Sequence, residues 1–409
     1  MTAEYTVLII GYIFGFYMAW NIGANDVANS MASAVGAKAI TLRQAVFIAG
    51  ILNVVGAVFL GSHVTDTIRK GIVSPDVMSD PHVALLGALA ALIAAALWVF
   101  FSTWKAFPVS TTHAIVGAML GFGIVAGGFS SVNWTKLLAI VASWIISPLF
   151  SMLIAFVMFK IIYRFILTRE NLLEKAIKLS PRFIGAAFFL VILSFLFKTP
   201  LGKTMAMGTA SSIGVALTVA IALGYAGKWL LRRYIKTKGE EGVEDIFRRL
   251  QIGTSCYVAL SQGANDVANA VGPLAVVYFL VKTGSIGGTV PVPVFLLLFG
   301  GVGIACGISM WGTRVIQTVG SKITTLTNTR GFSVDFGAAT TVLIASKLGL
   351  PVSTTHAAVG SVIGVGLAKG IEAVNFRIVF KIVLYWIITV PAAAVTSIVI
   401  YKILDIIFF

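Results

Sequence analysis

Two short polar motifs, each present twice, carry the residues of this sequence that could do chemistry. Gly23–Asn29 and Gly263–Asn269 both read GANDVAN, whereas Pro108–Ala114 and Pro351–Ala357 both read PVSTTHA. Because the two identical strings recur at nearly the same separation along the chain, they indicate an internal duplication.

The GANDVAN motif supplies oxygen ligands and a negative charge. Asp26 and Asp266 lie in apolar stretches, where a carboxylate costs about 2.5–3.5 kcal/mol on insertion scales unless it is paired or hydrated. Oxygen ligands with one negative charge favour a hard monovalent cation, and a helix broken at the motif glycine would add backbone carbonyls. Helix packing through the asparagines is the alternative. The predicted cation ligands are Asn25, Asp26, Asn29, Asn265, Asp266 and Asn269.

The PVSTTHA motif combines a proline, three hydroxyl residues and a histidine. If Ser110 and Ser353 cap helices that begin at Thr111 and Thr354, backbone N–H groups and the positive end of each helix dipole point at one place. Neutral hydroxyl donors could then hold a tetrahedral oxyanion and still release it. Ordinary capping of two core helices is the alternative. The predicted anion ligands are Ser110, Thr111, Thr112, Ser353, Thr354 and Thr355.

Four further polar residues have open roles. His113 and His356 could carry protons because histidine titrates near neutral pH, but we favour a structural role in which they orient a threonine hydroxyl. Asp335 and Asn53 are possible members of a polar relay, with solvation at a loop edge as the alternative.

The composition describes the elements that must position these motifs. Of 409 residues, 58% are hydrophobic and 11% are charged, and the mean hydropathy is +0.98. A soluble domain averages about 25% charged residues, so we expect an integral membrane protein. The net charge of +15 would suggest nucleic acid in a soluble protein, but here it follows from basic residues beside membrane spans, and no nucleic-acid partner is expected.

The predicted fold is an all-α polytopic membrane protein with about twelve transmembrane segments. Residues 1–163 form a first repeat, 164–250 a connector with two spans and basic loops, and 251–409 a second repeat. Each repeat is expected to contain a broken first helix and a hairpin whose tip carries PVSTTHA. The segments are 5–22, 44–61, 83–104, 114–129, 136–162, 183–197, 205–231, 251–281, 292–311, 336–350, 356–368 and 378–402.

The basic loops orient the repeats. Residues 164–182 and 228–249 are rich in Lys and Arg, which places them in the cytoplasm by the positive-inside rule. Counting spans outward from them puts both termini outside, so the two repeats have opposite orientations in the membrane. Secondary transporters often have this inverted architecture, with the substrate site between the halves. A multi-pass protein of the plasma membrane is expected.

Paired GANDVAN and PVSTTHA motifs in inverted halves resemble the PiT family of inorganic phosphate transporters. Two other stretches, Thr67–Gly71 and Gly331–Asp335, are also similar to that family. The resemblance implies sodium-coupled phosphate import, with Asp26 and Asp266 needed for transport and the hydroxyl runs at the phosphate. It also implies a homodimer in the lipid bilayer and no cofactor other than co-transported sodium ions. The short connector indicates a prokaryotic member.

Other functions compete with this one. Proton-coupled transport of phosphate or sulfate is the nearest alternative. A membrane hydrolase or phosphotransferase that uses Ser110 or Thr111 with His113 is disfavoured, because one active site does not require an inverted duplicate. A passive anion channel is the third alternative.

Overall fold

The computed structural model is built of helices. It describes residues 3–61, 71–198, 202, 204–205, 207–235, 237–284, 292–348 and 352–408. The α-helices of these residues are α1 (Ala3–Gly36), α2 (Leu42–Leu60), α4 (Pro75–Met78), α5 (Pro81–Trp104), α6 (Thr111–Gly127), α7 (Trp134–Ile162), α8 (Leu172–Lys198), α10 (Thr209–Tyr234), α11 (Gly239–Thr283), α12 (Val294–Gln317), α13 (Asn328–Lys347), α14 (Thr354–Lys369) and α15 (Phe376–Phe408). Single π-helical turns extend α7 at Tyr163–Leu167 and α12 at Thr318–Lys322.

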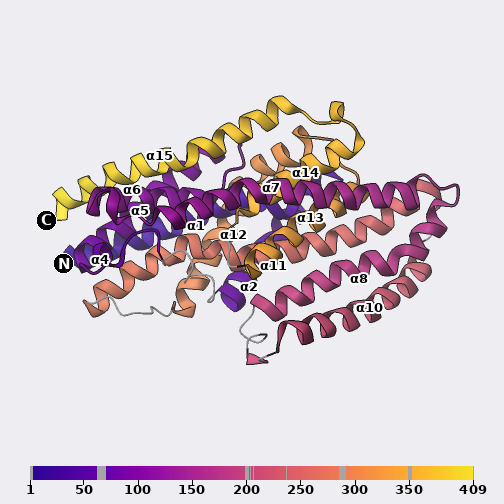
Figure 1. The fold of residues 1–409 in the computed structure, drawn as a ribbon, viewed down its shortest axis with the longest axis horizontal. Coiled ribbons are helices and arrows are strands. Elements are labelled where there is room, and N and C mark those ends of the chain that lie inside the picture. The colour runs from indigo at the N-terminus through magenta and orange to yellow at the C-terminus, as the bar shows by residue number, and fades with distance from the viewer. Residues whose placement is uncertain are drawn as a thin grey trace.

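The helices account for the twelve apolar segments of the sequence. Within the described part of the chain, nine helices are long and apolar enough to cross a membrane. The remaining three segments are the shorter or less apolar helices α6, α13 and α14. The helices run roughly along the long axis of the molecule, and both ends of the chain lie at the same end of it (Figure 1).

The expected break in the first helix of each repeat is wrong. Both α1 and α11 run as continuous α-helices through their GANDVAN motifs. The motif glycines serve close packing instead, because a Cβ atom at Gly23 would collide with the carbonyl oxygen of Ile304 in α12. A Cβ atom at Gly263 would collide with the backbone of Asn53 in α2. Small residues that allow helix backbones to approach closely are typical of packing inside a membrane.

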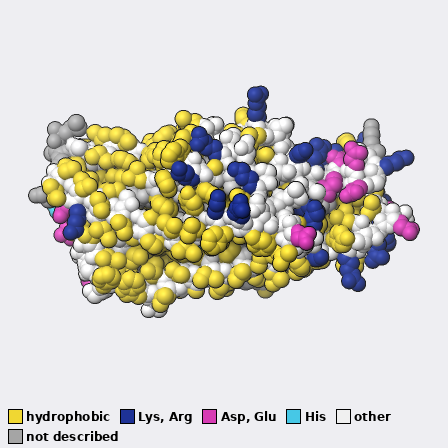
Figure 2. Space-filling model, turned by 90° about the horizontal axis from the view of Figure 1, so that it is seen from above, with side chains coloured by type: hydrophobic (Ala, Val, Ile, Leu, Met, Phe, Trp, Pro, Cys, Tyr) yellow, Lys and Arg dark blue, Asp and Glu magenta, His cyan; other side chains and the backbone are white. Residues whose placement is uncertain are grey.

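Apolar side chains cover much of the outer surface. Large side chains such as Phe47, which is 70% exposed, and Phe380, which is 71% exposed, face outward. Figure 2 shows such side chains over one long face of the molecule, with charged side chains gathered near the middle and toward one end. This distribution fits a belt in contact with lipid and polar regions beyond it.

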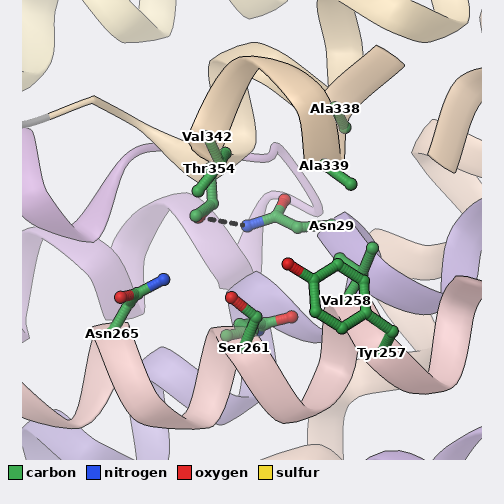
Figure 3. Close-up of a pocket in the computed structure, with 10 residues that line it drawn as sticks. Asn29, Tyr257, Val258, Ser261, Asn265, Ala338, Ala339, Val342 and Thr354 are labelled. Carbon is green, nitrogen blue, oxygen red and sulfur yellow. Dashed lines mark hydrogen bonds between the residues drawn. The ribbon is translucent and has the colours of Figure 1, made fainter. Parts of the chain in front are cut away.

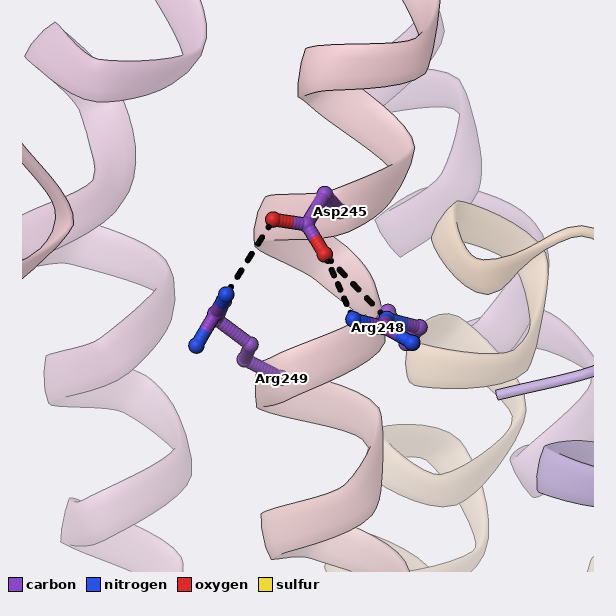
Figure 4. Close-up of polar contacts among 3 residues, drawn as sticks. All are labelled: Asp245, Arg248 and Arg249. Carbon is purple, nitrogen blue, oxygen red and sulfur yellow. Dashed lines mark hydrogen bonds and ion pairs between the residues drawn. The ribbon is translucent and has the colours of Figure 1, made fainter. Parts of the chain in front are cut away.

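The N-terminal part of α11 extends the helix beyond the length that a membrane requires. At 1.5 Å per residue, its 45 residues span about 68 Å, roughly twice the hydrocarbon core. Near this end, Asp245 contacts Arg248 at 2.9 Å and Arg249 at 3.4 Å (Figure 4). Pairs at these helical spacings stabilise an exposed helix by a few tenths of a kcal/mol each.

Helix contacts between the two halves of the chain come in pairs. α1 packs against α12, and α11 packs against α2. In the same way, α6 packs against α15, whereas α14 packs against α7. A Cβ atom at Gly117 would collide with the backbone of Val390 in one interface, and a Cβ atom at Gly360 would collide with that of Pro148 in the other. Each interface therefore has a counterpart that the corresponding helices of the two halves form.

The packing role of Gly263 can be tested against other glycines of α11. We expect Gly263→Ala to cost about 1–3 kcal/mol, because the methyl group meets backbone atoms that cannot rotate away. Gly253→Ala and Gly272→Ala are the controls, since a Cβ atom at either meets nothing within 4 Å. The controls should keep or raise the melting temperature, because alanine favours a helix. Equal melting temperatures for all three variants in detergent would contradict this packing role.

Candidate functional site

Each PVSTTHA motif ends in the first turn of a helix. Ser110 precedes α6, and its Oγ accepts a hydrogen bond of 3.2 Å from the backbone N–H of His113. Ser353 precedes α14 and accepts an equivalent bond of 3.2 Å from His356. The predicted caps are confirmed; Pro351, which begins the second copy, lies outside the described residues. Each cap satisfies one of the free N–H groups of its helix and leaves others available for an anion.

The first hydroxyl run contacts GANDVAN residues from both halves. Thr111 Oγ1 donates a hydrogen bond of 2.8 Å to Asp26 Oδ2. Asn269 Nδ2 donates to Thr111 Oγ1 at 3.1 Å and to Thr112 Oγ1 at 3.4 Å. The two GANDVAN motifs, which are distant in sequence, therefore meet around Thr111.

The second hydroxyl run has matching contacts. Asn29 Nδ2 donates to Thr355 Oγ1 at 3.0 Å and to Thr354 Oγ1 at 3.2 Å. Thr355 Oγ1 in turn donates to the backbone oxygen of Val109 in the first PVSTTHA motif at 3.2 Å. Both hydroxyl runs and both GANDVAN motifs thus form one polar cluster between α1, α11 and the starts of α6 and α14.

Two acidic side chains lie inside this cluster. Asp26 is 1% exposed and Asp266 is 4% exposed, and they are close enough for their charges to repel each other. Oδ1 of Asp26 has no hydrogen-bond partner at normal distance. Two buried carboxylates near each other are stable only when a proton or a cation reduces their charge.

Asn25 and Asn265 occupy different environments. Asn25 is fully buried, and its Nδ2 donates to Thr103 Oγ1 at 2.9 Å and to the backbone oxygen of Phe107 at 3.0 Å. Its Oδ1 accepts a bond of 3.0 Å from the backbone N–H of Val109. The Asn25 amide therefore fixes α1 to the turn between α5 and α6. Asn265, by contrast, is half-buried and lines a pocket.

This pocket borders the polar cluster and is small, with a cavity volume of about 20 Å³. In Figure 3, Asn265, Ser261 and Tyr257 lie along one side of α11 and face Thr354 and Val342 across the pocket. Gln262 is 2% exposed, and neither its amide oxygen nor its amide nitrogen has a partner. The lining residues are Asn29, Tyr257, Val258, Ser261, Gln262, Asn265, Ala338, Ala339, Val342 and Thr354.

The two motif histidines contact each other. The His113 and His356 rings contact each other edge to face, with their centroids 4.3 Å apart. His113 stacks on Trp144 at 3.5 Å, His356 stacks on Trp386 at 3.7 Å, and His356 Nδ1 lies 3.0 Å from the backbone oxygen of Trp144. These contacts join α6 and α14 to the final helix of each half.

Sequence reasoning missed Trp144 and Trp386 as well as Tyr257, Ser261 and Gln262 of the pocket wall on α11. A signal was present, because each tryptophan precedes a proline within an apolar helix near the end of a predicted repeat, Pro148 in α7 and Pro391 in α15. Tyr257 repeats Tyr17 of the first half, whereas Gln262 carries no repeated signal, since it occupies the position that Ile22 holds in the first half.

Asp335 and Asn53 lie outside the main cluster. Asp335 is 2% exposed and accepts hydrogen bonds from three hydroxyls: Ser33 at 2.5 Å, Thr254 at 3.0 Å and Ser255 at 2.6 Å. Asn53 is buried, and its side chain donates to the Ala49 carbonyl at 2.9 Å. Solvation at a loop edge is excluded for both residues.

Fold and site together define a multi-pass membrane transporter. Its buried polar cluster contains hydroxyls at two helix starts, two carboxylates and several amides, all within a helical bundle that has an apolar outer surface. Polar residues placed inside a membrane bundle in this way mark the path of a transported solute.

The chain belongs to the phosphate transporter family, whose model matches residues 22–397. The resemblance to inorganic phosphate transporters is therefore confirmed, and the protein is a transporter and not an enzyme. A protein of Pyrococcus abyssi named as a candidate phosphate permease is 50% identical over 97% of this chain and 98% of its own length. Inorganic phosphate transporter 2-1 (chloroplastic) of Arabidopsis thaliana is 40% identical over 95% of this chain and 70% of its own.

A solved structure described as the sodium-dependent phosphate transporter has a similar fold. Its TM-score is 0.89 and its sequence identity is 48%, and the match covers 98% of this chain and all of the other.

The capping role of Ser353 gives a prediction about stability. Ser353→Ala should destabilise the protein by about 1 kcal/mol, because the N–H of His356 loses its acceptor. Ser353→Asn should retain most of the stability, since asparagine caps helices as well as serine does. Thermal unfolding in detergent without phosphate measures both variants. If alanine and asparagine lower the melting temperature equally, the serine does not act as a cap.

Proposed function

We propose that this protein is a secondary active transporter that imports inorganic phosphate together with sodium ions. The phosphate lies at the starts of α6 and α14, where the hydroxyls of Ser110, Thr111 and Thr112 and of Ser353, Thr354 and Thr355 face it. Membership of the phosphate transporter family supports phosphate as the anion. The similar structure described as sodium-dependent supports sodium as the cation.

One observation carries this proposal: the buried carboxylate of Asp26 is bonded to the Thr111 hydroxyl at the start of α6. The ionised carboxylate at this position would repel an anion, because like charges repel strongly in a medium of low dielectric constant. A cation between them removes the repulsion and attracts both. Anion binding and cation binding at this place therefore support each other.

Sodium ions lie beside Asp26 and Asp266 in this proposal. The amide oxygens of Asn29 and Asn269 complete the ligands, because the Nδ2 atom of each already donates to the threonines. Asn265 can add an oxygen from the pocket wall, whereas the Asn25 amide is occupied by the α5–α6 turn. Oxygen ligands of this kind suit a hard cation.

Transport follows from linkage between the two ligands. Bound sodium raises the affinity for phosphate, and bound phosphate raises the affinity for sodium by the same factor. A sodium gradient can therefore drive phosphate uptake. No covalent step is needed.

The two halves, 1–163 and 251–409, act as inverted repeats around this site in our proposal. The paired interfaces of α1 with α12 and of α11 with α2 support this arrangement. Residues 164–250 connect the halves through two spans, α8 and α10, whose basic flanking loops lie on the cytoplasmic side of the plasma membrane, and both termini lie outside. Alternating access then results from movement of one half against the other around the central cluster.

Uptake of labelled phosphate into proteoliposomes tests the function. An inward sodium gradient should drive accumulation, and excess sulfate should not compete. Accumulation driven only by a proton gradient would show proton coupling, whereas flux that never exceeds equilibrium would indicate a channel. Either result contradicts sodium symport.

The acidic residues give a sharper test with a matched control. Asp26→Asn and Asp266→Asn should each lower sodium-driven uptake by about 100-fold or more, because a buried cation that loses its charged partner costs several kcal/mol. Asp245→Asn, an exposed acid in the α11 extension, should leave uptake unchanged. Retained sodium-driven uptake in both cluster variants would refute the assignment of the cation sites.

A further inference from the structure

The pocket beside the polar cluster is lined mainly by the second half of the molecule. Its wall consists of α11, α13 and the start of α14, with Asn29 of α1 as the one lining residue from the first half, and several of its residues are half-buried. Tyr257 and its counterpart Tyr17 are both half-buried, and the other half-buried lining residues are Val258, Ser261, Asn265, Val342 and Thr354.

The same wall exists in the first half of the chain, but there it is closed. Counting from each repeated motif, these five residues correspond to Met18, Asn21, Asn25, Val99 and Thr111. The first four are 0% exposed, and Thr111 is 2% exposed. Corresponding helices and motifs therefore form a pocket in one half and a packed interior in the other.

Two sets of contacts keep the first half closed. The three hydrogen bonds of Asn25 fix α1 to the turn that follows α5. Aromatic rings then cover the same side: Tyr17 stacks on Trp20 with centroids 6.2 Å apart, and Phe100 stacks on Trp311 at 5.2 Å. Tyr17 also contacts Phe100 at 5.9 Å, which connects the two pairs.

We propose that the packed wall of α1 and α5 is the outer half of the transport path, and that Asn25 is the positioning residue that holds it shut in this conformation. The inference rests on the proposed function, because it assigns the pocket and its closed counterpart to the two ends of one path. Tyr17 precedes Asp26 in a helix that begins outside, whereas Tyr257 precedes Asp266 in a helix that begins in the cytoplasm. The pocket therefore faces inward and the closed wall faces outward.

In the outward-open conformation, the wall of α1 and α5 opens and the pocket beside α11 and α13 closes. Asn25 leaves the α5–α6 turn, so that Met18, Asn21 and Val99 become accessible from outside. The pocket closes as Asn265 becomes fully buried, as Asn25 is here. Loss of the Asn25 contacts must therefore favour the outward-open conformation.

Accessibility of single cysteines tests this path without requiring transport. Cys256 and Cys306 are first replaced by serine in the full-length chain. Val99→Cys and the matched Val342→Cys are then introduced separately, each with and without Asn25→Ala. Labelling rates with a membrane-impermeant methanethiosulfonate reagent are compared between right-side-out and inside-out membrane vesicles.

We expect Val342→Cys to react from the cytoplasmic side and Val99→Cys to react only from the outside. Asn25→Ala should speed labelling of Val99→Cys by about tenfold or more, because three buried hydrogen bonds are lost, and should slow labelling of Val342→Cys. Asn265→Ala should shift both rates in the opposite direction, and Thr103→Val should give a smaller effect of the same sign as Asn25→Ala. The last two variants keep the test decisive if Asn25→Ala does not fold.

Labelling of Val99→Cys from the cytoplasmic side would overturn the inference. So would the absence of labelling from either side in every variant, or equal rates with and without Asn25→Ala and Thr103→Val. Phosphate uptake measured separately distinguishes this failure from failure of the proposed function. If the labelling pattern holds but sodium drives no phosphate uptake, the path is correct and the substrate assignment is wrong.

Discussion

The contact between a buried carboxylate and a helix start is the constraint on which the rest of the structure depends. Asp26 lies within hydrogen-bond distance of Thr111, whose helix dipole and hydroxyls suit an anion. An anion and the ionised carboxylate would repel each other there, because like charges interact strongly in a medium of low dielectric constant. A cation bound together with the anion would remove this repulsion. In the proposed function, this repulsion is the physical reason for coupling between the two ligands.

Close helix packing is what brings this contact about. The glycines of both GANDVAN motifs let the backbones of α12 and α2 approach α1 and α11. The tryptophan–histidine stacks then fix the starts of α6 and α14 against α7 and α15. The rigid frame surrounds a polar centre whose two sides are packed unequally. That difference is the structural basis of the alternating-access proposal.

Much of the fold and site could be predicted because the sequence carries them as local signals. Apolar length predicted the helical segments, and Ser110 and Ser353 were predicted as caps because capping depends on only a few neighbouring residues. The break at Gly23 and Gly263 was predicted wrongly, since a glycine permits either unwinding or close approach and only the partner helix decides which. The role of Asn25 and the partners of the histidines depend on residues far away in sequence, which no local pattern reveals.

Equilibrium binding of phosphate at several sodium concentrations tests the central claim most directly. Isothermal titration calorimetry of the purified protein should show phosphate affinity that rises with sodium, and sodium affinity that rises by the same factor with phosphate. Asp26→Asn should remove most of this dependence and leave the helix starts in place. Phosphate affinity that is the same with and without sodium would contradict the account.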